Sequence, residues 1–487
     1  MSTIDAEMRT LERQAAEGDV QARRRLDAIK ARLDPDRLGS DQERVLEAVA
    51  VGKNLLMTGA PGTGKSTVIS RLRERLPGKV IAVTAATGLA ALRVGGSTLH
   101  RFARVMPDDV DNVLKQEPKT PADWERVMST QARIAYYRAE GIERDEFSRR
   151  ISRVDVLVVD EISMVDAITF ELAMRVIVLA RRRYSSEFHR ESGVEERDVT
   201  YVDRPIQVLL SGDFAQLLPS KSGQCGLAFE APSWGKLALV LVELRESYRS
   251  MTDDRLTAML VGLRDGIVSD RTVEILKSLH GTFDPEGEGV VRLVSKRDEA
   301  RDWNDKKIKS LRGEERTLRS IDSGDRKLLA DCLSPDALLL KVGAKVMFTQ
   351  NGFDAQGLRF VNGMIGVVRS MSGAGIVVHV PEDGEDYIVS ERGTWSIWGT
   401  NAFGERVALA ERQQYPLAHA WALTLHKAQG CTFDKVSVDL SSAWEFGHVY
   451  VALSRARRLA DLNIESMPNR EINMDKRIGP WLHEAPA

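Results

Sequence analysis

Cysteine is scarce in this sequence: Cys225, Cys332 and Cys431 are the only three among 487 residues. Cysteines this few and this far apart exclude a disulfide-rich scaffold and indicate reduced thiols. The eight histidines are equally scattered, and no zinc-type spacing is visible. Long apolar runs are missing as well, and no charged-then-apolar leader opens the chain. We therefore expect a cytoplasmic protein with no membrane partner.

A surplus of charge of either sign is also absent. The 69 lysines and arginines nearly balance the 71 aspartates and glutamates, which gives a formal net charge of −2. The whole molecule thus has no general attraction for a polyanion, and a nucleic-acid partner would need a local track of basic residues. The length of the chain suggests about three domains.

A glycine-rich stretch stands between a predicted buried strand (54–58) and a predicted helix (67–76). Two glycines five apart, followed by Lys and Ser, match the loop that wraps nucleotide phosphates with backbone N–H groups. Lys65 is expected to reach the β- and γ-phosphates, and the Ser66 hydroxyl to hold Mg²⁺. The alternative is an ordinary glycine-rich turn before a helix. The predicted nucleotide-binding residues of this stretch are Gly59, Ala60, Pro61, Gly62, Thr63, Gly64, Lys65, Ser66 and Thr67.

Two further buried strands end in polar side chains. Residues 154–159 run into Asp160 and Glu161. Such a carboxylate pair suits phosphate transfer, because Asp160 would hold the metal and Glu161 would orient and deprotonate the attacking water. Residues 206–210 lead to Gln216, which could report hydrolysis of a γ-phosphate to the rest of the structure. The alternative for Asp160 and Glu161 is that they are two acids at a strand end with no function. The alternative for the segment that leads to Gln216 is a simple Gly-Asp turn.

Other candidates lie near these segments. Gln42, on a predicted helix just ahead of the glycine-rich loop, could contact adenine or simply face solvent. Thr84 and Thr87 follow a predicted strand at a helix N-terminus, which makes a second seat for phosphates. His100 and Phe102 flank an arginine, a mixture suited to stacking on bases and pairing with phosphates, although core positions are the default for both.

Predicted strands and helices alternate along most of the chain, and polar residues follow the strand ends. This pattern describes an α/β protein with doubly wound parallel sheets. We expect a polar helical extension at 1–36, a first domain at 37–240 with an inserted subdomain at 104–150, and a second α/β domain at 241–334 and 413–487. A run of short period-two strands at 335–412 predicts a small β-barrel inserted in that second domain.

These stretches together resemble the superfamily-one helicases of the Pif-like and RecD-like group, with Dda of T-even phages as another relative. The resemblance extends from Leu38 to about Leu462 and is clearest at Gly59–Ser66, 160–164, 212–217, 415–430 and 450–455. It implies two RecA-like domains with ATP between them and single-stranded DNA across their tops. It also implies that 104–150 separates strands and that 335–412 is an SH3-like barrel.

The resemblance assigns roles to single residues. It implies that Gln42 contacts adenine, that Gln216 senses the γ-phosphate, and that Arg249 and Arg455 act as arginine fingers. Their guanidinium groups would stabilise transition-state charge when the domains close. The residues expected to touch DNA are Thr84, Thr87, His100, Phe102, Thr424 and His426.

The expected activity is that of an ATP- and Mg²⁺-dependent DNA helicase, a monomeric motor moving 5′ to 3′ on single strands and opening forked or 5′-tailed duplexes. A bacterial or phage-like, nucleoid-associated protein of DNA repair, recombination or telomere maintenance would fit the resemblance. Three alternatives stay open: an RNA-acting helicase, a catalytically silent DNA-binding scaffold, and a P-loop ATPase that remodels protein. The segment Leu217-Leu218-Pro219-Ser220 departs from the usual one Leu and two prolines, which leaves the closer subfamily open.

Overall fold

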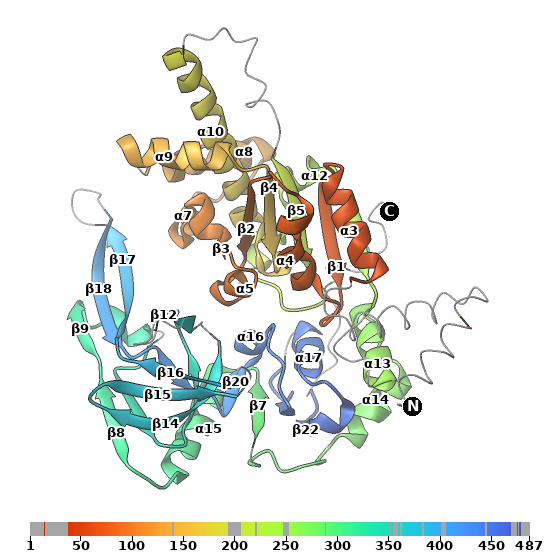
Figure 1. Ribbon diagram of the computed structural model, residues 1–487, viewed down its shortest axis with the longest axis vertical. Helices are drawn as coiled ribbons and strands as arrows, with labels where there is room; N and C mark the ends of the chain where they lie inside the picture. The colour runs from red at the N-terminus through yellow and green to blue at the C-terminus, as the bar shows by residue number, and fades with distance from the viewer. Residues whose placement is uncertain are drawn as a thin grey trace. The chain divides into compact units, whose positions relative to one another are not determined.

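The computed structural model describes residues 14, 38–138, 141–192, 206–219, 222–246, 253–287, 289–332, 334–350, 352–353, 359–360, 363–381, 384–400, 406–443, 446–468, 475 and 477–478. The chain divides into two compact units, described separately below (Figure 1). The first unit comprises Met1–Thr272, Glu445–Arg458 and Ile472–Ala487, and the second comprises Val273–Trp444 and Leu459–Glu471. Apart from residue 14, the predicted extension at 1–36 lies outside the described residues.

A six-stranded sheet in the order β3-β2-β4-β5-β1-β6 forms the centre of the first unit (Figure 1). All its neighbouring strands are parallel. The strands are β1 (Leu55–Gly59), β2 (Ile81–Ala85), β3 (Ser97–Thr98), β4 (Val156–Asp160), β5 (Gln207–Gly212) and β6 (Val240–Leu244). A parallel sheet needs both faces covered, which explains why β1 and β4 are buried along their whole length.

Alternate residues of these strands pack into two separate cores, one on each face of the sheet. Leu55 and Met57 of β1 join one core with the apolar side chains of α3 and α4. Leu56 points the other way and joins the core that contains α8, α9 and α10. Helices therefore cover both faces, and the predicted doubly wound α/β fold is confirmed.

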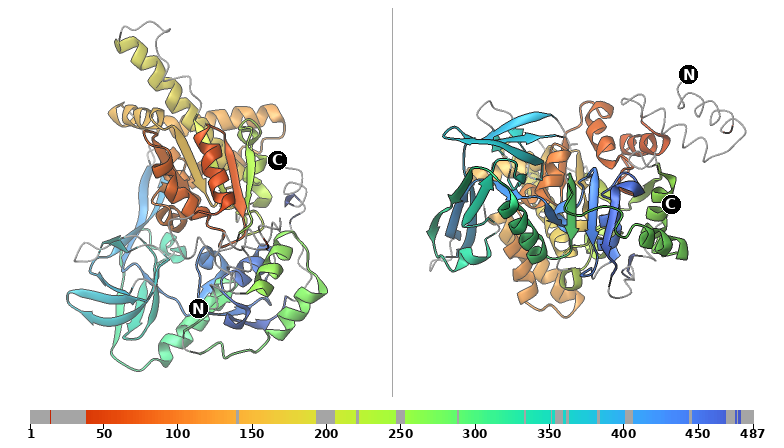
Figure 2. Two further views of the ribbon diagram at one scale, coloured as in Figure 1. Left: turned by 45° about the vertical axis from the view of Figure 1, so that its right-hand side comes forward. Right: turned by 90° about the horizontal axis from the view of Figure 1, so that it is seen from below.

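The helices of the first unit are α3 (Ser40–Ala50), α4 (Lys65–Arg75), α5 (Gly88–Arg93), α6 (Leu99–Ala103), α7 (Pro107–Lys115), α8 (Pro121–Tyr137), α9 (Gly141–Ser152), α10 (Ala167–Ser192), α11 (Ser222–Cys225), α12 (Pro232–Gly235), α13 (Asp254–Arg264) and α17 (Phe446–Leu453), with short 3₁₀ turns η1 (Ile162–Met164) and η2 (Ala228–Glu230). The predicted inserted subdomain is helical, and its helices α8 and α9 pack against α10 (Figure 2). Thr120 caps α8 by accepting a hydrogen bond from the backbone N–H of Asp123.

A second parallel sheet, in the order β20-β7-β21-β22, organises the second unit. Its strands are β7 (Val290–Val294), β20 (Ala422–Thr424), β21 (Lys435–Asp439) and β22 (Leu462–Ser466). Helix α14 (Asp270–Ser278) leads from the first unit, and α15 (Arg297–Ser310), α16 (Leu425–Ala428) and the 3₁₀ turn η4 (Leu459–Asp461) complete the α/β part. Asn304 fixes α15 to β20, because its amide exchanges two 2.9 Å hydrogen bonds with the backbone of Ala422.

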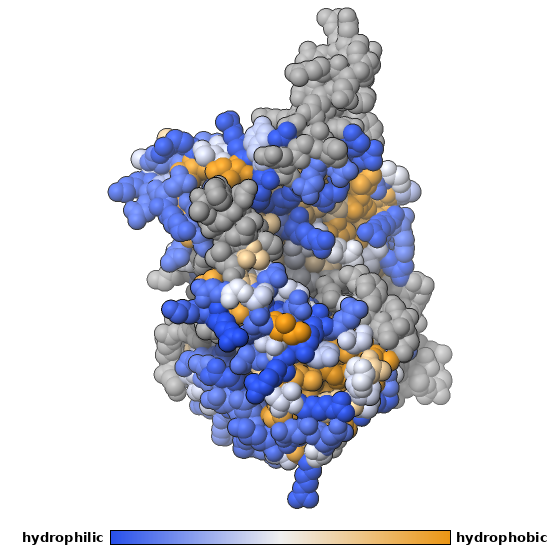
Figure 3. Space-filling model, turned by 90° about the vertical axis from the view of Figure 1, so that its left-hand side faces the viewer, coloured by the Kyte–Doolittle hydropathy of each residue, from blue (hydrophilic) through white to orange (hydrophobic). Residues whose placement is uncertain are grey.

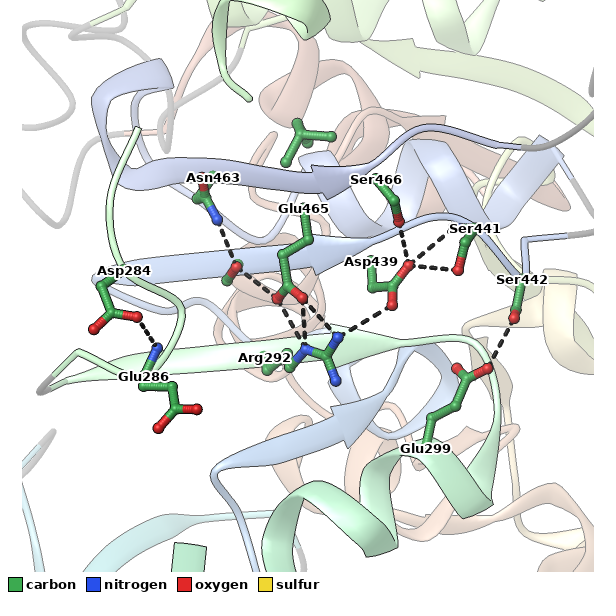
Figure 4. Close-up of polar contacts among 12 residues, drawn as sticks. Asp284, Glu286, Arg292, Glu299, Asp439, Ser441, Ser442, Asn463, Glu465 and Ser466 are labelled. Carbon is green, nitrogen blue, oxygen red and sulfur yellow. Dashed lines mark hydrogen bonds and ion pairs between the residues drawn. The ribbon is translucent and has the colours of Figure 1, made fainter. Parts of the chain in front are cut away.

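Charged side chains join the strands of this second sheet. Arg292 of β7 donates to both carboxylate oxygens of Glu465 on β22 and to Asp439 on β21 (Figure 4). Ser437 donates to the same Glu465 at 2.8 Å, and the Arg292 guanidinium lies 4.2 Å from the ring centroid of Trp303. The network fixes the relative register of three strands.

The remainder of the second unit is rich in antiparallel strands. They are β8 (Glu315–Arg319), β9 (Ile321–Gly324), β10 (Ala337–Lys341), β11 (Lys345–Phe348), β12 (Gly352–Phe353), β13 (Arg359–Phe360), β14 (Ile365–Ser372), β15 (Gly375–Val380), β16 (Glu385–Val389), β17 (Gly393–Thr400), β18 (Arg406–Gln414) and β19 (Leu417–His419), with the 3₁₀ turn η3 (Leu328–Asp331). The largest sheet has the order β16-β15-β14-β11-β19, and a second has the order β17-β18-β9. The SH3-like barrel and the exact domain limits stay predictions.

Two surface properties complete the description. On the face drawn in Figure 3, hydrophilic residues dominate and hydrophobic residues form separate patches. Among the helices that the structure describes, none combines the length and the apolar character needed to cross a membrane.

Candidate active site

The glycine-rich loop joins β1 to α4 at the carboxyl end of the first sheet. Gly62 and Gly64 have φ angles of 89° and 81°, in the left-handed region that glycine adopts without strain. At Gly59 a Cβ atom would lie 2.6 Å from the carbonyl oxygen of Leu244, so only glycine fits beside β6. The backbone therefore has the tight curve that a phosphate-wrapping loop needs.

Lys65, the first residue of α4, is folded back onto this loop. Its Nζ donates to the carbonyl oxygens of Gly59 at 2.6 Å and Ala60 at 3.2 Å. Burial lowers the pKa of Lys65, while the negative charges of Asp213 and Glu161 oppose that shift. The lysine thus lies within electrostatic reach of carboxylates that follow two neighbouring strands.

Gln42 connects α3 to the loop. Its side-chain oxygen accepts a hydrogen bond from the backbone N–H of Gly39 at 3.0 Å, and its Nε2 donates to the carbonyl of Thr63 at 3.2 Å. Gln42 is only 4% exposed. The alternative interpretation of the sequence, in which this side chain faces solvent, is therefore wrong. The role in binding adenine stays a prediction.

Asp160 and Glu161 lie where β4 ends, as predicted. Asp160 is buried and accepts a 2.7 Å hydrogen bond from the Ser211 hydroxyl of β5. Burial and then the charge of Glu161 raise the pKa of Asp160 to about 6. Glu161 has φ 51° and ψ 43°, a left-handed conformation that costs a non-glycine residue about 1–2 kcal/mol. Strain of this kind is characteristic of functional positions.

The donor set at this strand end fits a magnesium ion. Mg²⁺ prefers oxygen ligands and takes only one or two of them from the protein when it also binds phosphates. Ser66 at the start of α4 and Asp160 at the end of β4 supply a hydroxyl and a carboxylate. A positive charge beside two adjacent acids also favours their ionised forms.

Asp213, just after β5, accepts hydrogen bonds from four groups. The donors are Tyr450 Oη at 3.0 Å, Arg264 Nε at 3.3 Å, the backbone N–H of Ala215 at 3.3 Å and Gln216 Nε2 at 3.4 Å. Asp213 is completely buried, and a buried carboxylate needs such partners. The contact with Gln216 means that the predicted γ-phosphate sensor is held by Asp213.

Arg264, at the end of α13, links Asp213 to two more strands. It donates to Thr58 Oγ1 at 3.1 Å, one residue before the glycine-rich loop, and to the carboxylate of Glu243 on β6. Burial disfavours its charge, but Asp213 and Glu243 outweigh that effect and hold its pKa above the ordinary value. Arg264 therefore ties the ends of β1, β5 and β6 together.

Helix α17 packs directly on the loop that carries Gln216. A Cβ atom at Gly447 would lie 2.4 Å from the Gln216 carbonyl oxygen, so the contact requires glycine. Arg455 follows α17 and is 1% exposed. Its guanidinium donates to the carbonyl of Val451 at 2.9 Å and to the hydroxyl of Ser454 at 2.8 Å. Arg249, the other predicted arginine finger, lies outside the described residues.

The predicted DNA contacts of the first unit differ in accessibility. Thr84 is fully buried, and its hydroxyl donates to the carbonyl of Val158 at 2.7 Å. Phe102 belongs to the core, as its default interpretation holds. Thr87 and His100 are partly exposed, and burial lowers the pKa of His100.

The predicted DNA contacts of the second unit lie beside other cations. Thr424 is the N-cap of α16, and its hydroxyl accepts from the backbone N–H of Lys427 at 3.5 Å. His426 and Lys427 are exposed, and the pKa of each is lowered, first by partial burial and then by the charge of Arg297. Because β20 pairs in parallel with β7, the segments that follow Thr424 and Val294 emerge side by side.

Sequence reasoning missed several residues of this site. Arg264 looked like an ordinary basic residue at a helix end, and its partners lie 21, 51 and 206 residues away. Tyr450 and Asp213 stand inside stretches that carry the family resemblance, and this was the one available signal. Ser211 could have been noticed as a hydroxyl at the end of a buried strand.

Comparisons with known proteins agree with this geometry. A family model described as "AAA domain" matches residues 42–220, and another described as "Helicase" matches residues 399–485. The ATP-dependent DNA helicase PIF1 of Danio rerio is 32% identical over 453 residues, which cover 91% of this chain and 63% of that protein. The ATP-dependent DNA helicase Pif1 of Bdellovibrio bacteriovorus is 30% identical over 446 residues, covering 91% of this chain and 90% of that protein.

A solved structure extends the comparison to the fold. The crystal structure of Pif1 helicase from Candida albicans resembles this chain with a TM-score of 0.69 at 29% identity, covering 92% of this chain and 98% of that one. The two parallel sheets are accordingly those of two RecA-like domains. From the matched length, the shared sheets and the strand-end residues together, this chain belongs to the Pif1 family of superfamily-one helicases.

Proposed function

We propose that this chain is an ATP-dependent DNA helicase that couples hydrolysis of Mg-ATP to 5′-to-3′ movement along single-stranded DNA. The observation that carries the proposal is the position of Lys65, folded onto the glycine-rich loop at the sheet edge where β4 leads to Glu161 and β5 leads to Asp213. Those three groups come from three separate segments of sequence. ATP is the substrate that this arrangement fits.

The protein groups divide the hydrolytic step among them. Glu161 accepts a proton from water as the water oxygen bonds to the γ-phosphorus, and the bond from that phosphorus to the β–γ bridging oxygen breaks, which leaves ADP and phosphate. Lys65 and the backbone N–H groups of the loop bind the phosphate oxygens. Bound Mg²⁺, held by Ser66 and Asp160, would supply positive charge to the β- and γ-phosphates. Arg455 and Arg249 would add charge in the closed state.

The nucleic-acid part of the proposal rests on local positive charge. Arg297, His426 and Lys427 of the second unit are exposed, and Arg297 acts electrostatically on the other two. Within the described residues, no carboxylate forms an ion pair with Lys427 or Arg297. In a chain of net charge −2, such a cluster is the local track that phosphates require. Thr424 is proposed to contact DNA in the second unit, and Thr87 and His100 are proposed to contact it in the first.

The chain spans 63% of the length of the Danio rerio relative and 90% of the bacterial one. The activity is therefore proposed for this chain from its own site and from the family to which it belongs. We propose that the protein is cytoplasmic, that it acts as a monomeric motor, and that its substrates are forked or 5′-tailed duplexes.

The decisive experiment measures ATP turnover with and without single-stranded DNA, and strand separation on duplexes with either a 5′ or a 3′ single-stranded tail. We expect DNA to stimulate turnover and only the 5′-tailed duplex to open. Stimulation by RNA alone would favour the RNA-acting alternative. ATP turnover that ignores both nucleic acids would favour an ATPase that remodels protein, and absence of turnover would favour a silent scaffold.

A further inference from the structure

Two arginines of the first unit lie over two buried aromatic rings, and a third arginine is near enough to act electrostatically on one of them. The Arg104 guanidinium lies 4.7 Å from the ring centroid of Phe147, and Arg150 lies 5.2 Å from Phe102 and 5.5 Å from Phe147. Arg101 precedes Phe102 on α6 and is exposed, while α9 carries both Phe147 and Arg150. We call Arg101, Arg104 and Arg150 the arginine cluster.

Among the residues that the structure describes, the arginine cluster has no acidic counterpart. Within the described part of the chain, no carboxylate forms an ion pair with any of its members; Arg104 donates to the backbone carbonyl of Glu143 and Arg150 to that of Phe102. Burial lowers the pKa of Arg150, and the charges of Arg104 and Arg101 lower it further. Like charges placed together without a carboxylate destabilise the folded protein, and a bound anion would remove that cost.

The backbone of Arg104 adds a second cost. The residue ends α6 with φ 58° and ψ 24°, the left-handed conformation that glycine usually supplies at a helix C-terminus. A residue with a side chain pays about 1–2 kcal/mol for it. Arginine at this position is explained if its guanidinium is needed over the Phe147 ring.

The cluster also borders the proposed DNA track. Helix α6 follows β3 directly, and β3 pairs with β2 so that Ser97 and Thr98 stand opposite Thr84 and Ala85. His100, a proposed DNA contact, immediately precedes Arg101 on α6. A strand held at the end of β2 would therefore pass the cluster without leaving the first unit.

We propose that the arginine cluster binds the phosphodiester backbone of DNA, an inference that rests on the proposed function and names a further part of the same binding surface. Guanidinium groups suit this role because their planar donor pairs match phosphate oxygens and stay charged. The Phe102 and Phe147 rings restrict the motion of Arg104 and Arg150, so less entropy is lost when phosphate binds. The inserted subdomain that contains α9 thereby becomes a DNA-binding part of the unit.

The test is the salt dependence of DNA affinity for the full chain. Fluorescence anisotropy would be measured on a single-stranded oligonucleotide and on a blunt duplex, for R101Q, R104Q and R150Q. Each lost contact should reduce the slope of log affinity against log salt by about 0.7 on the single strand or about 0.9 on the duplex. The substrate that shows the reduction identifies which form of DNA supplies the phosphates. R133Q, a substitution at an exposed arginine of α8, is the matched control and should keep the wild-type slope.

Folding and binding effects can be separated. Arg150 packs on two rings, so its variant is accompanied by a thermal unfolding curve, whereas Arg101 is exposed and its substitution should not lower the unfolding midpoint. Slopes of R101Q and R104Q equal to that of R133Q on both substrates would overturn the inference. The inference would also be overturned if only R150Q showed a reduced slope and that variant also had a lowered unfolding midpoint. Wild-type protein that binds neither substrate would refute the proposed function instead.

Discussion

The hydroxyl of Tyr450 donates a 3.0 Å hydrogen bond to Oδ2 of Asp213, a residue 237 positions earlier in the chain. Both groups are completely buried. Burial and then the charge of Asp213 raise the pKa of Tyr450 well above its ordinary value, so the phenol stays protonated and remains a donor. The bond attaches α17 to the end of β5, where Gln216 lies.

Tyr450→Phe should destabilise the first unit with little change in shape. The substitution leaves the buried carboxylate of Asp213 with one donor fewer, and hydrogen bonds to charged groups contribute about 1.5–3 kcal/mol. Urea unfolding would measure the loss. Tyr136→Phe is the matched control, because Tyr136 shares a 2.9 Å hydrogen bond with the uncharged Ser148. The Tyr136→Phe substitution should lower the free energy of unfolding by less, about 0.5–1.5 kcal/mol. Equal decreases for the two variants would show that the charge of Asp213 does not strengthen its hydrogen bond with Tyr450.

Arg264→Met should destabilise the first unit more strongly. Removing one member of a buried ion pair typically costs about 3–5 kcal/mol, because the remaining carboxylate is left uncompensated. Arg264→Lys should recover part of the loss, since a lysine keeps the charge but lacks the fork that reaches Asp213 and Thr58 together. The exposed Arg255 of the same helix provides a control, Arg255→Met, which should change the unfolding free energy by less than about 0.5 kcal/mol.

Lys65→Ala should abolish ATP hydrolysis while single-stranded DNA affinity stays within a few-fold of wild type. Lys65 is proposed to bind the phosphates, and the proposed DNA contacts use other side chains. Turnover assays and anisotropy would be run in parallel with Lys53→Ala, a change at an exposed lysine just before β1. A comparable fall in both activities would show that the substitution disturbs the fold or that the site is misassigned.

Arg455→Lys should reduce ATP turnover on the order of a thousandfold, as loss of an arginine finger does, with nucleotide affinity much less changed. Lysine is preferred to alanine here because the buried Arg455 side chain also bonds the Val451 carbonyl. Steady-state kinetics would separate kcat from KM. Near-normal kcat in a folded variant would remove Arg455 from the catalytic machinery.

Acid should weaken the second unit through Asp322. The Arg412 guanidinium forms paired hydrogen bonds with this carboxylate at 2.9 and 2.8 Å and lowers its pKa to about 2. A lowered folded-state pKa contributes stability above the unfolded value of about 4, and that stability is lost as the pH falls towards 2. The difference in unfolding free energy between wild type and Asp322→Asn should therefore be constant above pH ~5 and shrink below pH ~4. Asp302→Asn, at a side chain 77% exposed, should show no such change.

Local sequence patterns were sufficient to predict the strand and the helix that flank the glycine-rich loop. The strand predicted at 54–58 is β1 (Leu55–Gly59) and the helix predicted at 67–76 is α4 (Lys65–Arg75), so the glycine-rich loop lies between a strand and a helix as its pattern requires. Helix α10 continues from Ala167 to Ser192, because no glycine or proline interrupts the sequence before Gly193. The roles of Arg264 and Tyr450 could not be predicted, because tertiary packing alone brings them to Asp213. The same holds for Arg150, whose contact with Phe102 joins residues of different helices.

The discontinuity of the first unit has a consequence during protein synthesis. Asp213 and its neighbours leave the ribosome 237 residues before Tyr450, a delay of roughly 10–50 s at about 5–20 residues per second. During that interval Asp213 lacks the hydrogen bond from the Tyr450 hydroxyl. The loop that carries Gln216 also lacks its contact with Gly447 of α17. The hydrogen-bonded surroundings of Asp213 in a newly made molecule are thus completed only after Val273–Trp444, the larger segment of the second unit, has been translated.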